Sequence, residues 1–74
     1  MPPYYFHVRR GQLTVIDQVG MELASDIEAA LEAARRGREI AKSDTLKGIP
    51  TQAGLIIVED EWDDRVAEVP LDVG

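Results

Sequence analysis

The sequence predicts one α+β domain in which a single helix packs on one face of a four-stranded, mostly antiparallel sheet. Three observations predict it: two β-rich runs around a glycine near the start, one long run with helical periodicity, and two more β-rich runs near the end. The element order is therefore β-β-α-β-β. A length of 74 residues allows one domain and no second one, so we assign residues 1–74 to it.

The first two strands read as a hairpin. Tyr4–Arg9 and Gln12–Ile16 are rich in β-formers, and Arg10-Gly11 between them supplies a two-residue loop with a glycine available for positive φ. Asp17–Gly20 reads as a second turn, after which the chain runs extended into the helix.

The helix start is marked by Ser25 and Glu28, which form a capping-box pattern before an alanine-rich run. We predict a helix over Asp26–Lys42. Its apolar arc is about 200° wide, against the ~100° typical of a helix that rests on one surface. One half of the arc should pack on the sheet. The other half should meet another chain or lie under the next loop, and we assign to it Ala29, Ala33, Gly37 and Ile40.

A polar connection over Ser43–Gly54 follows the helix, with Leu46 and Ile49 as its expected anchors. The last two runs, Leu55–Asp60 and Arg65–Leu71, form a second hairpin. A proline near its end has no N–H for a ladder, so the last strand should end there or lie on a sheet edge.

The alternation of strand residues predicts which side chains face away from the helix. In the first strand the apolar set Tyr4, Phe6 and Val8 should face the core. In the second strand Leu13 and Val15 should face inward. The open face should then have an apolar centre of Ile16, Val66 and either Leu55/Ile57 or Ile56/Val58. Polar side chains should surround it, and they are Tyr5, His7, Arg9, Thr14 and Glu68. An apolar patch with a polar rim commonly marks a contact surface.

Composition excludes several classes. The net charge of −6 disfavours binding to a phosphate backbone. The absence of cysteine excludes disulfides and thiolate metal sites. There is no apolar run near the ~20 residues that span a bilayer, and no signal peptide is recognisable, so we expect a cytoplasmic protein.

Three groups of residues are candidates for a chemical site. His7 has no recognisable nucleophile beside it, which favours a packing or interface role over catalysis. The acidic run Glu59–Asp64 lacks the glycine and spacing of a calcium loop, which favours a solvated turn and no metal. Within that run Trp62 should fold back onto its hairpin, with anchoring of a partner as the alternative.

The basic cluster Arg35, Arg36 and Arg38 resembles a phosphate patch when taken alone. However, Glu32 and Glu39 lie four residues from Arg36 and Arg35, so salt bridges along a solvated helix face explain the cluster without nucleic acid.

The opening MPPYYFHVRRG, the DQVGMEL segment and the closing IIVEDE…RVAEVPL resemble an uncharacterised family of short, mainly alphaproteobacterial proteins that begin M-P-x-Y-x-F-H-x-R. The resemblance spans almost the whole chain. It departs at Asp63-Asp64, where that family tends to have glycine. The family has no assigned activity, so the resemblance supports the fold and implies no cofactor.

The hypothesis that these features favour is a non-enzymatic interaction module that binds itself, as a homodimer, or another protein. One alternative is a nucleic-acid-associated regulator that uses Arg35, Arg36 and Arg38. The other is a small-ligand binder or enzyme centred on Tyr5, His7 and Arg9.

Overall fold

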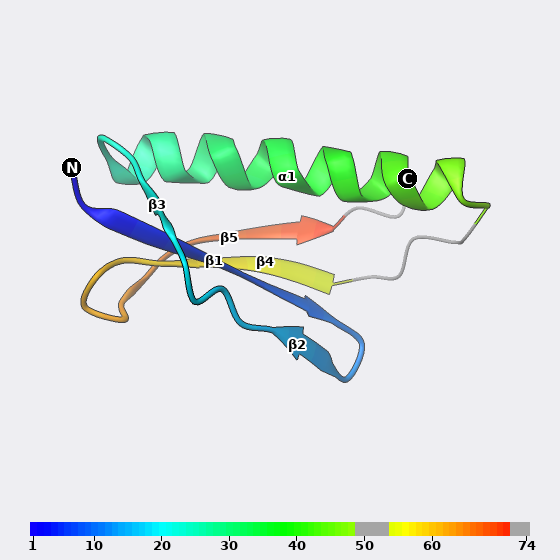
Figure 1. Ribbon diagram of the computed structural model, residues 1–74, viewed down its shortest axis with the longest axis horizontal. Coiled ribbons are helices and arrows are strands. Elements are labelled where there is room, and N and C mark those ends of the chain that lie inside the picture. Colours follow the sequence, from blue (N-terminus) through cyan, green and yellow to red (C-terminus); the bar gives the residue numbers. More distant parts are fainter. Residues whose placement is uncertain (49–53, 72–74) are drawn as a thin grey trace.

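A computed structural model describes residues 1–48 and 54–71 and shows one helix lying along one face of a sheet (Figure 1). The elements are β1 (Pro3–Arg10), β2 (Leu13–Val15), β3 (Met21–Glu22), α1 (Asp26–Leu46), β4 (Gly54–Glu59) and β5 (Arg65–Leu71). The strand order is β2-β1-β4-β5, and β3 also pairs with β1. All pairings among these strands are antiparallel. The predicted α+β fold is confirmed, with β3 as a fifth strand that the prediction lacked.

The alternation of β1 is as predicted. Tyr4 and Phe6 are buried under the helix, so His7 lies on the opposite face, where it pairs with Ile57 of β4. The hairpin turn is shifted by one residue from the prediction, because Arg10 pairs with Leu13. The two turn residues are therefore Gly11 and Gln12.

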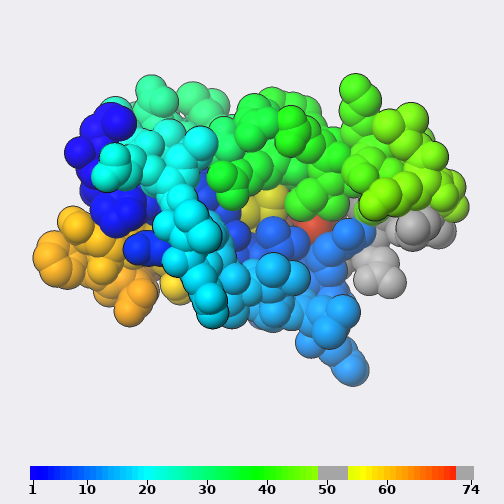
Figure 2. Space-filling model, in the orientation of Figure 1, coloured from blue at the N-terminus to red at the C-terminus, as the bar shows by residue number. Residues whose placement is uncertain are grey.

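One edge of β1 is covered in two pieces. β2 pairs with its last three residues, and β3 pairs with Pro3 and Tyr4. Between them the chain leaves the ladder, and the carboxylate of Asp17 accepts the backbone N–H of Phe6 at 3.1 Å in place of a strand carbonyl. Figure 2 shows the segment that contains β3 lying across β1. The gap in this edge creates a place for Asp17 beside the open face of the sheet.

The helix begins as predicted and ends later. The Ser25 side chain accepts the backbone N–H of Glu28 at 3.3 Å, which is a normal N-cap contact. The helix continues to Leu46, one turn beyond the predicted end at Lys42. Leu46 is 78% exposed, so its predicted role as an anchor is wrong. The other predicted anchor, Ile49, lies outside the described residues.

Two polar contacts join β1 to the ends of α1. The Tyr4 hydroxyl donates to Asp26 at 2.7 Å, and this hydrogen bond, together with burial, raises the pKa of Tyr4 to about 12. At the other end Arg10 donates to Asp44, a buried carboxylate in the last helical turn. Asp44 explains the longer helix, because its pairing with Arg10 ties down the turn that the polar sequence predicts as a loop.

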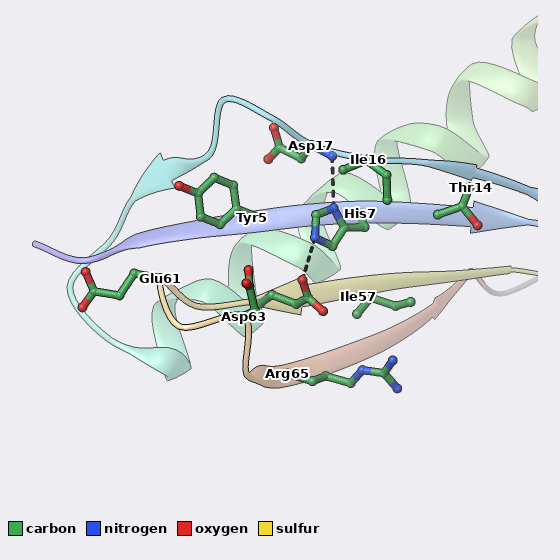
Figure 3. Close-up of a pocket in the computed structure, with 10 residues that line it drawn as sticks. Tyr5, His7, Thr14, Ile16, Asp17, Ile57, Glu61, Asp63 and Arg65 are labelled. Atoms are coloured by element: carbon green, nitrogen blue, oxygen red, sulfur yellow. Dashed lines mark hydrogen bonds and ion pairs between the residues drawn. The ribbon is translucent and has the colours of Figure 1, made fainter.

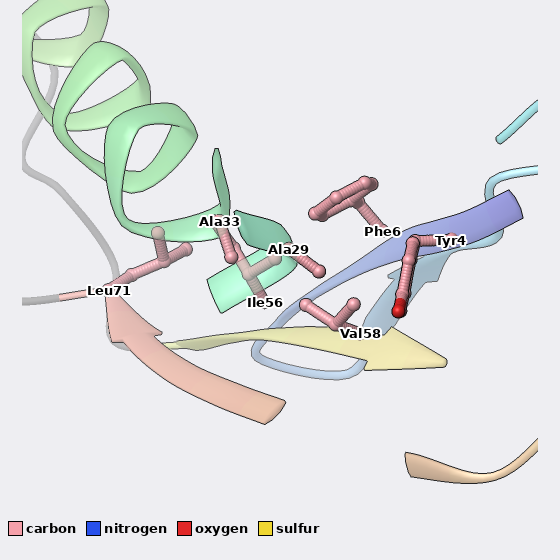
Figure 4. Packing of buried hydrophobic residues seen from close by; sticks show 7 residues of the cluster. All are labelled: Tyr4, Phe6, Ala29, Ala33, Ile56, Val58 and Leu71. Carbon is pink, nitrogen blue, oxygen red and sulfur yellow. The ribbon is translucent and has the colours of Figure 1, made fainter. Parts of the chain in front are cut away.

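The core lies between α1 and the sheet. Figure 4 shows its buried residues, which are Tyr4, Phe6, Ala29, Ala33, Ile56, Val58 and Leu71. The prediction that placed Ala29, Ala33, Gly37 and Ile40 on the half of the helix free of the sheet is wrong, because Ala29 and Ala33 are part of this core. All four face the sheet: Gly37 lies next to Ile56 and Leu71, and Ile40 packs against the cluster. The reason is that alanine and glycine let the helix approach the strands closely.

The free half of the helix contains Ile27 and Leu31, which are 74% and 64% exposed. The helix packs over β4 and β5, leaving β2 uncovered. Leu13 and Val15 share the helix side of the sheet, as predicted, yet both remain exposed. Val66 was predicted on the open face. It packs against the core instead, because the β4–β5 register shifts beside it, between Val58 and Glu59.

Candidate functional site

A hollow of about 450 Å³ lies on the open face of the sheet, on the side away from α1 (Figure 3). Of the five polar residues predicted to surround this face, Tyr5, His7 and Thr14 line the hollow, whereas Arg9 and Glu68 do not. Two residues of the predicted apolar centre, Ile16 and Ile57, line it as well. The prediction missed the remaining lining residues, which are Asp17, Glu59, Glu61, Asp63 and Arg65.

His7 lies in the middle of the hollow and is held at both ring nitrogens. Its Nδ1 accepts the backbone N–H of Asp17 at 3.0 Å, and its Nε2 lies 3.0 Å from Oε1 of Glu59. Since Nδ1 accepts, the proton is assigned to Nε2, which donates to the carboxylate. The ring therefore has no free lone pair with which to remove a proton or bind a metal. The arrangement makes His7 a bridge between the Asp17 turn and β4.

Asp17, whose backbone N–H contacts Nδ1 of His7, is itself held in place by its carboxylate. Its carboxylate accepts the backbone N–H groups of Phe6 (3.1 Å), Val19 (3.0 Å) and Gly20 (3.1 Å). Burial raises the pKa of Asp17, but the N–H groups of Phe6, Gly20 and Val19 outweigh burial and hold this pKa below its usual value. An aspartate at the first position of a turn is the sequence signal that would have identified it.

Tyr5 forms the wall of the hollow next to this turn. Gly20 has a φ of 76°, and a Cβ at this position would lie 2.8 Å from Cε1 of Tyr5. The ring is thus seated directly against the Gly20 backbone. A glycine is needed here both for the backbone conformation and for the close approach of the ring.

The turn between β4 and β5 carries acidic side chains to the rim. Oδ1 of Asp60 accepts the backbone N–H groups of Trp62 and Asp64 at 2.9 and 3.0 Å, which closes the turn. Asp63 adopts a φ of 62°, and Glu61 and Asp63 both line the hollow. Trp62 is 74% exposed, so the prediction that it folds back onto the hairpin is wrong.

The hollow is acidic overall. Four carboxylates line it, against one guanidinium, that of Arg65, which also forms an ion pair with Glu68 at 2.9 Å. Two of the carboxylates, those of Asp17 and Glu59, are occupied by the contacts described above. Within residues 1–48 and 54–71, no three His, Cys, Asp or Glu side chains are grouped so that they could hold a metal ion. In the same ranges no helix is long and apolar enough to cross a membrane.

The arginine cluster of α1 lies outside the hollow and is paired with glutamates. Glu32 accepts from Arg35 at 2.7 Å and from Arg36 at 2.8 Å, and Arg35 also donates to Glu39. The hydrogen bond from Arg35, and to a lesser extent that from Arg36, lowers the pKa of Glu32 to about 2, although burial opposes this shift. The predicted Glu32–Arg36 and Arg35–Glu39 pairs are confirmed. Binding of nucleic acid by this cluster stays a prediction.

Comparison with known proteins identifies the family. A family model described as a domain of unknown function, DUF6894, matches residues 4–72. No curated protein and no solved structure matches the chain. Because the match extends from the second residue of β1 to just beyond β5, it includes every element that builds the hollow, and the chain belongs to the DUF6894 family.

Proposed function

We propose that the protein is a small non-enzymatic binding module that holds a positively charged group of a partner protein in the hollow. The observation that carries this proposal is the open, acidic hollow of about 450 Å³ formed by β1, β2, β4, β5 and the turns that follow β2 and β4. Pockets of this size can enclose a side chain or a small ligand. The partner chemistry follows from the lining, which has four carboxylates and one guanidinium.

The geometry of His7 argues for binding rather than catalysis. A general base needs a free lone pair within reach of its substrate. Nδ1 of His7 is occupied by Asp17, and Nε2 faces Glu59. His7 thus has the position of a structural support under the hollow.

The rim supplies the groups that a cation would contact. Glu61 and Asp63 are exposed, line the hollow, and form no ion pair within the described parts of the chain. Tyr5 presents an aromatic ring beside them, and such rings attract Lys and Arg side chains. An arginine or lysine side chain fits both features.

A nuclear magnetic resonance titration tests the proposal. The ¹⁵N-labelled chain is titrated with a short end-blocked peptide containing two arginines, and with the same peptide containing two glutamates. We expect shifts for Tyr5, His7 and Asp63 with the arginine peptide only. Glu61→Gln should weaken binding, whereas the control Glu22→Gln, which removes an exposed carboxylate outside the hollow, should not. Equal shifts with the two peptides, or equal affinities of the two variants for the arginine peptide, would refute the proposal.

A further inference from the structure

A stripe of side chains runs along the flank of α1 that borders β5, outside the buried face of Ala29 and Ala33, and Figure 1 shows this helix as the outer layer of the fold. At 3.6 residues per turn its members fall within about 80° of one another. They are Ile27, Leu31, Ala34, Arg38, Ala41 and Thr45, which we call the outer stripe. Its two large apolar side chains, Ile27 and Leu31, are 74% and 64% exposed, both in the first half of the helix.

Apart from Arg38, the second half of the stripe has small side chains and leaves room. A shallow groove of about 240 Å³ lies beside it, where Ala34, Gly37 and Ala41 meet Val69 and Pro70 of β5. Small residues let a second helix approach to the short end of the 8–10 Å range of interaxial distances. The large apolar side chains and the small side chains of the stripe therefore lie in opposite halves of the helix.

Charge along the stripe is divided in the same way. Glu28 flanks its first half, and Arg38 and Lys42 lie on or beside its second half. All three are exposed, and none forms an ion pair within residues 1–48 and 54–71. An antiparallel copy of the same helix would place opposite charges face to face, whereas a parallel copy would place like charges together.

We propose that the outer stripe is the contact surface for a second copy of this chain, with the two helices antiparallel about a two-fold axis near Ala34. This register sets Ile27 opposite Ala41 of the partner and Leu31 against the aliphatic stem of the partner's Arg38. It also pairs Glu28 with the partner's Lys42, twice by symmetry. The hollow lies on the opposite face of the sheet, so the assembly is independent of the proposed function.

This register brings Arg35 near its own symmetry mate at the two-fold axis, which would place two positive charges close together. The charge of Arg35 is already balanced within its own helix, since Glu32 and Glu39 both accept hydrogen bonds from its guanidinium. These two glutamates also hold the Arg35 side chain on the polar side of the helix. The register thus creates no uncompensated contact between like charges.

The proposed contact is confined to one helix face, which is small against the 1,200 Å² or more that stable complexes bury. We therefore expect a weak, reversible dimer. Its population should rise with protein concentration between roughly 20 μM and 2 mM, as measured by sedimentation equilibrium. Leu31→Glu should abolish the dimer. Leu13→Glu is the matched control, because Leu13 is 75% exposed and lies on β2, off the stripe. Circular dichroism checks that both variants stay folded.

Charge reversal tests the orientation of the helices. Glu28→Lys and Lys42→Glu should each weaken association by roughly threefold to tenfold, since each breaks two symmetric pairs. The double variant should restore the affinity. A chain that stays monomeric at 2 mM would overturn the proposal. So would equal effects of Leu31→Glu and Leu13→Glu, or a double variant no tighter than the single ones.

Discussion

The backbone N–H of Asp17 donates to Nδ1 of His7 at 3.0 Å, while the Asp17 carboxylate accepts the N–H of Phe6, the neighbour of His7 in β1. The two residues thus fix each other, and the turn after β2 is fastened to the middle of β1 rather than only to its ends. Because Nε2 of His7 also reaches Glu59, the fastening continues into β4. The floor of the hollow is one connected hydrogen-bond network.

The first prediction concerns the tautomer and the contribution of His7. Long-range ¹H–¹⁵N spectra at neutral pH should show the Nε2–H tautomer, because Nδ1 is an acceptor. His7→Ala should lower the free energy of unfolding by about 1–3 kcal/mol, since the Asp17 N–H and the Glu59 carboxylate lose their partner. Arg9→Ala, on the same face of the same strand, is the control in urea denaturation and should change little. An Nδ1–H tautomer would contradict the network.

The second prediction uses a matched pair of glycines with nearly equal φ. Gly20 and Gly48 adopt 76° and 73°, but only at Gly20 would a Cβ collide with a side chain, that of Tyr5. Gly48→Ala should cost about 1–2 kcal/mol from the backbone alone. Gly20→Ala should cost measurably more in urea denaturation and should shift the Tyr5 ring resonances. Equal costs for the two variants would mean that the Tyr5 ring moves aside freely.

The third prediction concerns acid stability. The folded state holds the pKa of Glu32 at about 2, below its ordinary value of 4.5, so the unfolded chain binds the proton more readily between these values. The stability that Glu32 contributes is present above pH 4.5 and is lost as the pH falls toward 2. Glu32→Gln should therefore lower stability at neutral pH and flatten its decline in acid. Glu22→Gln, the exposed control, should leave the slope of thermal midpoint against pH unchanged.

The fourth prediction concerns the rim of the hollow. Asp63 adopts a φ of 62°, a conformation that costs most residues about 1–2 kcal/mol and glycine almost nothing. We expect Asp63→Gly to stabilise the chain by up to about 1 kcal/mol, after the greater freedom of glycine in the unfolded state is subtracted. Asp63→Ala removes the same carboxylate without relieving the backbone and should be destabilising. If urea denaturation gives the same free energy of unfolding for both variants, the backbone conformation at Asp63 does not affect stability.

The sequence predicted features that depend on local rules. The helix start at Asp26 follows from one capping residue, Ser25, and the facing of His7 away from the helix follows from strand alternation. The turn at Gly20 also follows from the backbone preference of a single glycine. Each of these features depends on residues close together in the chain, which is why they could be found without a structure.

The features that sequence reasoning missed depend on contacts between distant residues. An apolar arc about 200° wide fits the sheet in two ways, and only the packing of Ala29 and Ala33 decides which half is buried. Glu59 joins the hollow because the β1–β4 register places it beside His7, and no local pattern gives that register. The exposure of Leu13 likewise depends on where α1 comes to rest over the sheet.

The last helical turn leads to the final prediction. Ser43 to Leu46 read as a polar loop, yet this segment is helical and Asp44 in it is buried against Arg10, 34 residues away. Removing one partner of a buried ion pair leaves the other charge uncompensated and typically costs about 3–5 kcal/mol, whereas replacing both with apolar residues is often neutral. Because the Arg10 side chain is 28% exposed, we expect the lower end of that range.

Arg10→Met should therefore destabilise the chain by about 3 kcal/mol and fray the helix beyond Lys42, with amide exchange rising first at the last turn. Asp44→Leu should do the same through the unpaired guanidinium. The double variant should regain most of the lost stability, because the apolar pair fills the same space between β1 and α1. A double variant whose loss in urea denaturation equals the sum of the two single losses would show that the two residues act independently. The last turn of α1 would then have to be held by something other than this pair.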